Sequence, residues 1–268
     1  MSHESFVRVF GDRRALIGMV HVPALPGTPR HSVPVENAAP MVAEEAALLV
    51  EAGFDAVMLE NMHDAPYLWG TFGPEVTAAM TRFLVEVRTS VEVPLGVQVL
   101  SGGHREALAV ALAGGADFIR CENFVFSHVA DEGLIERASA GELMRYRRSI
   151  GAEHIAVFAD IKKKHASHAI TGDLALGEAA SAAEFFGADG VIVSGTATAM
   201  PTEPSDIAEA RSGSGLPVLV GSGVTPDRIP SLRESDALIV GSWYKEGGRW
   251  DASPDAGRAR QLVEAFKG

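Results

Sequence analysis

The sequence has 268 residues, of which 47% are hydrophobic and 22% charged, and this balance is typical of a globular protein rather than a disordered or fibrous one. A single cysteine, Cys121, excludes a disulfide framework and a cysteine zinc cluster. The 23 Lys and Arg residues and 35 Asp and Glu residues give a net charge of −12, which argues against sequence-independent nucleic-acid binding.

Arginine carries most of the basic charge, because lysine occurs only at positions 162, 163, 164, 245 and 267. A saline cytoplasm and a GC-rich genome are both compatible with this bias. The N-terminal segment has no apolar stretch like that of a signal peptide, and no uninterrupted apolar run reaches the roughly 18 residues of a membrane span. We therefore expect a cytoplasmic protein without a membrane partner.

Short apolar runs recur along the chain, and eight of them predict buried strands. Continuous apolar runs without strict alternation suit parallel strands that are covered on both faces. In chain order, the predicted strands are residues 15–20, 55–60, 94–99, 117–121, 154–159, 189–193, 216–220 and 236–240.

Segments rich in Ala and Glu, with apolar residues at helical spacing, separate these runs and predict helices. The clearest are residues 36–52, 74–89, 103–114 and 174–187. The phrases EAGFDAV, AGGADFI and FFGADGV repeat one arrangement, in which a helix ends at glycine and an acidic residue precedes the next strand. Eight strand–helix units in about 250 residues predict one (β/α)8 TIM-barrel domain over residues 1–268, with a doubly wound open sheet as the alternative.

Active sites of such barrels lie at the C-terminal ends of the strands, so the polar residues there are the candidates for function. Along the first six strands these are His21, Glu60 with Asn61, Gln98, Arg120 with Glu122 and Asn123, Asp160 with Lys162, Lys164 and His165, and Ser194. The last two strands end in Gly221-Ser222-Gly223 and Gly241-Ser242.

The segment PVLVGSGVTPDRI (217–229) is the clearest single motif. Its glycines let the backbone approach a ligand, and Thr225-Pro226 predicts the start of a helix whose N-terminus would face an anion. The loops after the seventh and eighth strands form the phosphate site of many TIM barrels. We predict a phosphate site rather than two tight turns without a ligand, and its predicted residues are Ser194, Gly221, Ser222, Gly223, Gly241 and Ser242.

The densest charge follows the fifth strand, in the run DIKKKH (160–165). Strand alternation places Asp160 and Lys162 on one side, with Lys164 continuing that side. A carboxylate beside an amine suits acid–base chemistry or anion binding, and the alternative is a solvated basic loop. At the second strand, Glu60 is expected to act as a base, to hold a sugar diol, or to pair with Arg120.

Arg120 lies in the buried run FIRCEN and needs a partner, and Glu122 has the right parity to be that partner. His21 is expected to form hydrogen bonds, with catalysis as the alternative. The other histidines lack metal-ligand spacing, so no metal site is expected. The loop aromatics either stack on a ring of the substrate or close the top of the barrel.

Seven sequence blocks resemble the BtpA family. They are GMVHVPALPGTPR (18–30), GFDAVMLENMHDAPY (53–67), GVQVL (96–100), FIRCENF (118–124), FADIKKKHA (158–166), LVGSGVTPDRI (219–229) and IVGSWYKEGGRW (239–250). They occur in order over nearly the whole chain. The resemblance implies a barrel of the ribulose-phosphate-binding type.

The family pattern maps onto His21, Glu60, Asn61, Asp64, Asn123, Asp160, Lys164, His165, Gly221 to Gly223 and Gly241. The sequence departs from this pattern in two places. A neutral residue or His is expected where Lys162 stands, and more apolar or Asn-like residues are expected in place of Cys121-Glu122. The family name comes from a link to photosystem I biogenesis. Other members resemble enzymes of nucleoside or sugar-phosphate metabolism.

Our leading hypothesis is a purine nucleoside phosphorylase, a glycosyltransferase that uses inorganic phosphate as co-substrate and no other cofactor. Phosphate would attack the ribose, and Glu60 or Asn61 would hold the ribose hydroxyls. Asp160 would protonate or hydrogen-bond the leaving purine, and Lys164 would assist the anion. We thus expect Asp160, Glu60 and Lys164 to be catalytic. The expected substrate-binding residues are His21, Asn61, Asn123, Lys162 and His165.

Two alternatives remain open. One is an isomerase, aldolase or epimerase that acts on a phosphorylated pentose, with phosphate as a handle. The other is a non-catalytic assembly factor related to photosystem I biogenesis. In the enzyme readings, the partner is a small-molecule nucleoside or sugar phosphate, and we expect a homo-oligomer without a nucleic-acid partner.

Overall fold

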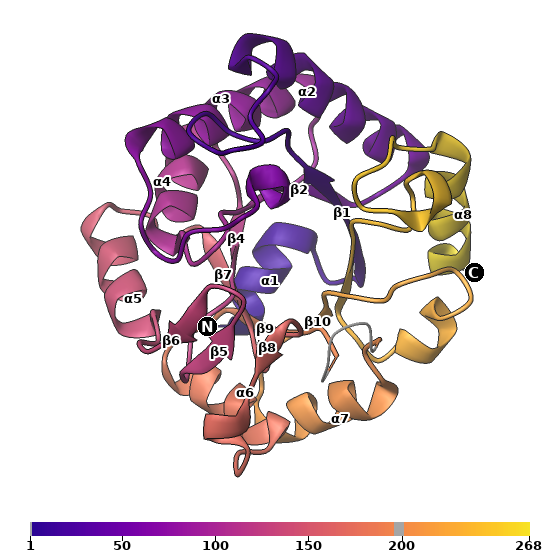
Figure 1. Ribbon diagram of the computed structural model, residues 1–268. Coiled ribbons are helices and arrows are strands. Elements are labelled where there is room, and N and C mark those ends of the chain that lie inside the picture. The colour runs from indigo at the N-terminus through magenta and orange to yellow at the C-terminus, as the bar shows by residue number, and fades with distance from the viewer. Residues whose placement is uncertain (1, 196–200) are drawn as a thin grey trace.

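The computed structural model describes residues 2–195 and 201–268, and within them eight parallel strands close into a barrel (Figure 1). Around the ring the strands are β1 (Ala15–His21), β2 (Ala56–Glu60), β3 (Leu95–Gln98), β4 (Phe118–Cys121), β7 (Ala156–Asp160), β9 (Gly190–Val193), β10 (Val218–Val220) and β11 (Ala237–Val240). Strand β11 pairs with β1 and closes the ring. Each predicted run overlaps one strand, so the (β/α)8 barrel is confirmed and the open sheet is wrong.

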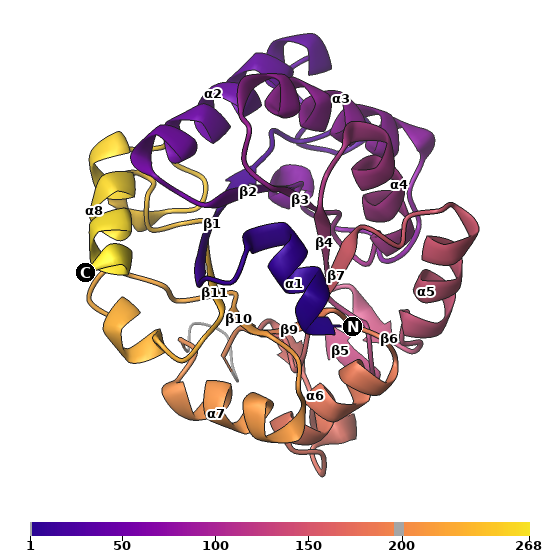
Figure 2. The same ribbon diagram turned by 180° about the vertical axis from the view of Figure 1, so that it is seen from behind.

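Most helices surround the barrel on its outside, while α1 lies across one end (Figures 1 and 2). The helices are α1 (Ser2–Phe10), α2 (Val35–Ala52), α3 (Pro74–Ser90), α4 (His104–Gly114), α5 (Ala140–Ser149), α6 (Leu176–Phe185), α7 (Pro204–Gly213) and α8 (Ala256–Lys267). Helices α2, α3, α4 and α6 match the four clearest predictions. Among the described residues, none of the helices combines the length and apolar character that a membrane span requires.

The repeated glycine–acid segments connect a helix to the next strand. The glycine ends the helix, and the aspartate forms a hydrogen bond to the strand before it. Gly53 and Gly115 end α2 and α4 in the left-handed conformation, with φ of 105° and 76°, which glycine adopts at little cost. The aspartate in each of the three segments then accepts the backbone N–H of the first or second residue of the preceding strand. These bonds are Leu16 N to Asp55 Oδ2 at 2.9 Å, Leu95 N to Asp117 Oδ2 at 2.8 Å and Val157 N to Asp189 Oδ2 at 2.9 Å.

Helix α1 lies across the N-terminal end of the barrel (Figure 2). Its Phe6 and Phe10 side chains belong to the apolar core inside the barrel. The Phe10 ring lies 5.5 Å from the ring of Phe118 on β4 and 6.0 Å from that of Phe158 on β7. These rings belong to the apolar core inside the barrel, whereas a second core lies between the strands and the outer helices. The apolar plug confines the polar residues to the opposite, C-terminal end.

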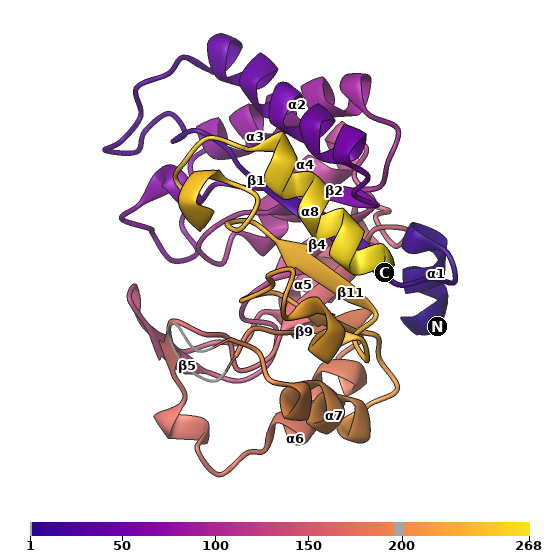
Figure 3. The same cartoon turned by 90° about the vertical axis from the view of Figure 1, so that its right-hand side faces the viewer.

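A small antiparallel sheet lies on the side of the molecule away from α1 (Figure 3). Its strands are β5 (His128–Ala130), β6 (Gly133–Ile135) and β8 (Ala166–Ser167), with β5 in the middle. The hairpin of β5 and β6 belongs to the loop after β4, and β8 belongs to the loop after β7. The sheet therefore ties two loops together at the C-terminal end of the barrel.

The helix predicted to start at Thr225-Pro226 is wrong. This segment forms turns, followed by the short 3-10 helix η3 (Ile229–Leu232). Thr225 Oγ1 donates a hydrogen bond to Asp227 Oδ1 at 2.7 Å instead of accepting one from a helix backbone. An α-helix dipole at this segment is therefore not available to an anion.

Candidate functional site

One layer of polar and small residues closes the top of the barrel interior. His21, Glu60 and Gln98 are in register on β1, β2 and β3, so they lie side by side. On each strand, the residue two positions earlier faces the barrel interior. Because side chains alternate between the two faces of a strand, these three side chains face the interior as well. By the same alternation, the layer contains His21, Glu60, Gln98, Arg120, Asp160, Ser194, Gly221 and Gly241.

A cavity of about 520 Å³ opens beside this layer at the C-terminal end of the barrel. Cavities of this size hold small-molecule ligands. Its charged and polar lining includes His21, Glu60, Tyr67, Arg120, Glu122, Lys163, Lys164, His165 and Ser194. The structure thus brings together side chains from both ends of the sequence.

Two loops of small residues, Gly221–Gly223 after β10 and Gly241–Ser242 after β11, line one part of the cavity. We call them the Gly–Ser loops. Lys164 contacts the first of these loops, because its Nζ donates a hydrogen bond to Ser222 Oγ at 2.7 Å. The backbone N–H of Lys164 also donates to Ser194 Oγ at 3.2 Å. All six predicted phosphate-binding residues therefore line this cavity, together with Lys164.

Glycine is required in both loops because the backbone packs closely on the layer below. A Cβ at Gly221 would lie 2.7 Å from Ile192 Cγ2, and one at Gly241 would lie 2.9 Å from His21 Nε2. Both distances are shorter than a carbon atom tolerates without movement of its neighbour. The absence of side chains leaves backbone and hydroxyl groups to face a ligand.

The Lys164 side chain is partly buried in the cavity wall. Burial lowers the pKa of its amine, and the nearby Arg120 charge lowers it further, whereas Glu60 and Asp160 act in the opposite direction. An ammonium group beside a hydroxyl and exposed backbone is a favourable place for an anion.

Glu60 is the most buried carboxyl group that lines the cavity, with 5% of the residue exposed. Burial raises the pKa of this carboxyl to about 7, although the Arg120 charge acts to lower it. Near neutral pH, Glu60 is thus divided between its protonated and ionised forms. A group with such a pKa is suited to donate or accept a proton during a reaction.

His21 connects Glu60 to the loop that follows β11. Its Nδ1 lies 3.1 Å from the carbonyl oxygen of Trp250, and its Nε2 lies 3.4 Å from Glu60 Oε2. Burial lowers the pKa of this imidazole to about 3, and the Lys245 charge acts in the same direction. His21 is therefore neutral at physiological pH.

Arg120 and Asp160 form an ion pair across the neighbouring strands β4 and β7. Nε of Arg120 donates to one carboxylate oxygen at 2.7 Å and Nη2 donates to the other at 2.9 Å. The prediction that Glu122 pairs with Arg120 is wrong, because Glu122 instead lies 3.4 Å from Lys163 Nζ. Both acceptor oxygens of Asp160 are thus engaged by Arg120.

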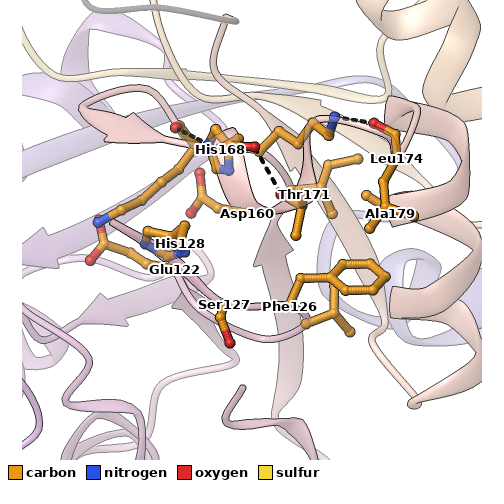
Figure 4. A pocket seen from close by; sticks show the side chains of 13 residues that line it. Glu122, Phe126, Ser127, His128, Asp160, His168, Thr171, Leu174 and Ala179 are labelled. Atoms are coloured by element: carbon orange, nitrogen blue, oxygen red, sulfur yellow. Dashed lines mark hydrogen bonds and ion pairs between the residues drawn. The ribbon is translucent and has the colours of Figure 1, made fainter. Parts of the chain in front are cut away.

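Asp160 lines a separate small pocket rather than the large cavity (Figure 4). Lys162 lines the same small pocket. This pocket has a volume of about 20 Å³, enough for one water molecule. The Asp160 side chain has no solvent-exposed surface, and Lys162 Nζ donates a hydrogen bond to the Leu174 carbonyl. Neither Asp160 nor Lys162 lines the large cavity, because strand β7 ends at Asp160 and Lys162 has a positive φ of 45°. Their catalytic and substrate-binding roles stay predictions.

The two predicted asparagines hold loops instead of lining the large cavity. Asn61 Nδ2 donates to Asp64 Oδ2 at 2.7 Å, and its Oδ1 accepts from the backbone N–H of Leu100 at 2.6 Å. Asn123 Nδ2 donates to the carbonyl of Arg137 at 2.7 Å. Neither asparagine lines the large cavity, and the Nδ2 group of each is bonded within the protein, so the structure does not support their predicted role in substrate binding.

His165 lies in the cavity lining as predicted, but it is exposed at the rim. Sequence reasoning missed several residues of the lining, namely Tyr67, Asp131, Glu132 and Lys163. Asp131 and Glu132 form the tip of the β5–β6 hairpin. Nothing in the sequence marked these two residues as part of the site, because strands of three residues are too short to be recognised as a hairpin.

The groups that line the cavity suit the binding of an anion and proton transfer. Within residues 2–195 and 201–268, no three His, Cys, Asp or Glu side chains are grouped so as to hold a metal ion. The expectation that the protein needs no metal stays a prediction.

Solved structures of other proteins share the barrel. Thiamine phosphate pyrophosphorylase from Pyrococcus furiosus matches with a TM-score of 0.56 at 14% identity, over 94% of this chain and 95% of that one. N-(5'-phosphoribosyl)anthranilate isomerase from the same organism matches with a TM-score of 0.55 at 13% identity, over 94% of this chain and 98% of that one. At such low identity these likenesses concern the fold alone.

Sequence relatives are much more similar. An uncharacterised protein of Caenorhabditis elegans, labelled mitochondrial, is 42% identical over 94% of this chain and 92% of its own. The photosystem I biogenesis protein BtpA of Synechocystis is 34% identical over 97% of this chain and 90% of its own. The model of the BtpA family matches residues 12–268. The chain therefore belongs to the BtpA family.

Proposed function

We propose that the protein is an enzyme of nucleoside or sugar-phosphate metabolism that binds phosphate at the Gly–Ser loops. Its reaction is the phosphorolysis of a purine nucleoside. One observation carries this proposal: the cavity holds a buried carboxyl group, Glu60, whose pKa is about 7, and also holds an anion-suited wall of glycine, serine and Lys164. Cleavage of an N-glycosidic bond by phosphate needs both an acid and a bound anion.

Phosphate occupies the Gly–Ser loops in this proposal. Lys164 supplies positive charge, and the hydroxyls of Ser194, Ser222 and Ser242 supply hydrogen bonds, because all four residues line the cavity. These contacts replace the helix N-terminus expected from the sequence. A phosphate held in this way has an oxygen free to attack C1′ of the ribose.

Glu60 takes the role of the acid that the sequence led us to expect of Asp160. As the bond from C1′ to the base breaks, Glu60 gives its proton to the base nitrogen and becomes a carboxylate. Phosphate forms the new bond to C1′ and loses its own proton to solvent, and Glu60 takes up a proton from solvent. Protons and charge therefore balance over one turnover.

The remaining cavity wall accommodates the nucleoside. Tyr67 and Trp243 line the cavity. In this proposal a purine packs against these aromatic side chains. Glu122 lines the same cavity and offers carboxylate oxygen to ribose hydroxyls, in the place of Asn61.

The test is to incubate the protein with a panel of purine and pyrimidine nucleosides, with and without phosphate, and to measure free base. We expect base release from purine nucleosides only when phosphate is present. Glu60→Gln keeps the size of the side chain but cannot donate an acid proton, so it should lower kcat by about 10²- to 10⁴-fold. Glu142→Gln, on an exposed ion pair with Arg137, is the matched control and should leave the rate unchanged. Base release that is independent of phosphate would contradict the proposal.

A second candidate function is an aldolase or isomerase that acts on a phosphorylated pentose. It is favoured by Lys164, because a cavity lysine with a lowered pKa is suited to attack a carbonyl carbon. Borohydride reduction in the presence of ribose 5-phosphate should then attach the sugar covalently to Lys164, with the loss of one water molecule. Mass spectrometry of the digested protein detects such a product, and phosphorolysis predicts none.

A further inference from the structure

We propose that His21 is a positioning residue for Glu60 and that the two form a neutral pair, in which Glu60 carries the hydrogen and donates it to His21 Nε2. The inference rests on the proposed function, because it explains how Glu60 is held ready as an acid. It assigns His21 a role other than the substrate contact expected from the sequence.

The Trp250 carbonyl fixes the tautomer of His21. A carbonyl oxygen only accepts hydrogen bonds, so the Nδ1 atom 3.1 Å away carries a hydrogen. In a neutral imidazole, Nε2 is then an acceptor. This acceptor faces Glu60 Oε2 at 3.4 Å, so the hydrogen between them belongs to the carboxyl group.

The surroundings of His21 oppose a positive charge on its ring. The side chains of His21 and Glu60 are only 3% and 7% exposed, and separated charges lose much hydration at such a site. Three further groups face His21 from other elements, and each acts against its protonation: Lys245 after β11, His63 after β2 and Arg120 on β4.

The surroundings of Glu60 are balanced in charge. Arg120 and Lys164 favour its carboxylate form, whereas Glu122 and Asp160 disfavour it. The Arg120 charge is largely committed to Asp160 through two hydrogen bonds. Burial has the largest effect and raises the pKa to about 7, so the neutral carboxyl group is the main form below that pH.

The neutral pair gives Glu60 a defined orientation before substrate binds. The backbone bond to Trp250 holds the His21 ring, and the ring holds the Glu60 carboxyl group at the edge of the cavity. When the glycosidic bond breaks, the hydrogen moves from Glu60 to the base nitrogen, and the bond to Nε2 is broken. His21 gains no proton in this step.

The direct test is nitrogen NMR of the ligand-free protein with [15N]histidine, which reports the protonation of each ring nitrogen and needs no variant to fold. We expect His21 to carry hydrogen on Nδ1 alone from pH 8 down to pH 5. Hydrogen on both ring nitrogens of His21 at pH 7 would overturn the proposal, because it means an ion pair with Glu60.

The positioning role is tested by the pKa of Glu60, measured by carbon NMR with [13C]glutamate and assigned with Glu60→Gln. His21→Gln keeps a donor and an acceptor and should leave this pKa in place. His21→Leu removes the acceptor for the neutral carboxyl, so the pKa should fall by about half a unit to one unit. A rise, or no change, would overturn the role.

His104→Leu is the matched control for these variants. His104 is also a buried histidine with a pKa lowered to about 3, but it lies on α4 and is not among the groups that shift Glu60. This variant should leave the Glu60 pKa unchanged, and a shift as large as that of His21→Leu would overturn the specific pairing. A neutral His21 in a protein that releases no base refutes phosphorolysis alone, whereas a charged His21 in an active phosphorylase refutes the pairing alone.

Discussion

Arg120 donates a hydrogen bond to each carboxylate oxygen of Asp160, from Nε to Oδ2 at 2.7 Å and from Nη2 to Oδ1 at 2.9 Å. The pair spans β4 and β7 in the layer that closes the barrel interior. The Asp160 side chain is fully buried, and Arg120 is its ion-pair partner.

Removal of that partner should destabilise the fold. Arg120→Met leaves a buried carboxylate unpaired, and we expect the free energy of unfolding to fall by about 3–5 kcal/mol. The double variant Arg120→Met, Asp160→Leu removes both charges and should recover most of that loss. Urea unfolding followed by circular dichroism measures both values, and a single variant as stable as the native protein would contradict the expected dependence.

The rate of phosphorolysis should fall as pH rises through about 7. Glu60 is the acid of the proposed reaction, and only its protonated form, which is present below its pKa of about 7, can donate. Well above this pH the rate should drop about tenfold per unit. The measurement is kcat/KM from pH 5.5 to 9 with the concentration of phosphate dianion held constant. A rate that rises over this range would assign the acid to another group.

Gly241→Ala should weaken phosphate binding. The new Cβ would lie 2.9 Å from His21 Nε2, so either the ring or the loop after β11 must move. We expect calorimetry to give a Kd for inorganic phosphate at least about tenfold higher, which corresponds to the loss of one good hydrogen bond. Gly141→Ala in α5, where the new Cβ has room, is the control and should bind phosphate normally.

Asp189→Ala should destabilise the start of β7. The carboxylate accepts the Val157 N–H at 2.9 Å and lies 3.1 Å from Arg147, and both partners are left without it in the variant. We expect a loss of about 1–3 kcal/mol in the free energy of unfolding. Asp189→Asn keeps an acceptor for the N–H and should lose less, and an equal loss would show that the charge matters more than the bond.

His104→Asn should make stability less sensitive to acid. Burial lowers the pKa of His104 to about 3, against 6.5 for an ordinary histidine, so between these values the folded chain binds less proton than the unfolded chain. The stabilising effect of the neutral ring is therefore complete above pH 6.5 and is lost as pH falls toward 3, with a slope of at most about 1.4 kcal/mol per unit. Urea midpoints of native and variant protein at pH 4.5, 5.5 and 7 measure this slope. An unchanged slope would contradict the expected titration.

The barrel was predictable from sequence because parallel strands that are covered on both faces read as continuous apolar runs. The layer of strand-end residues followed from the same reasoning, and so did the two Gly–Ser loops. The partner of Arg120 did not follow, because Asp160 is 40 positions away and becomes its neighbour only when β4 pairs with β7. Sequence reasoning favoured Glu122 as the partner, because it lies two residues after Arg120 and was therefore expected on the same side of the strand.

Two further errors also have physical causes. Thr225-Pro226 has the composition of a helix start, but the Thr225 hydroxyl bonds to Asp227 and the chain turns. The run from Asp160 to Lys164 was treated as one strand, although the backbone leaves the strand after Asp160 and Lys162 turns away from the cavity. Side-chain direction beyond a strand end depends on loop conformation, which alternation does not determine.

The plug that α1 forms at the N-terminal end of the barrel has a practical consequence for how ligands come and go. Phosphate, nucleoside, free base and sugar phosphate would all exchange at the C-terminal end, beside the β5–β6 hairpin. A protein tethered to a surface through α1 would keep that end turned toward solution. Binding and release of ligands could then be measured on the immobilised protein while its binding face stays accessible.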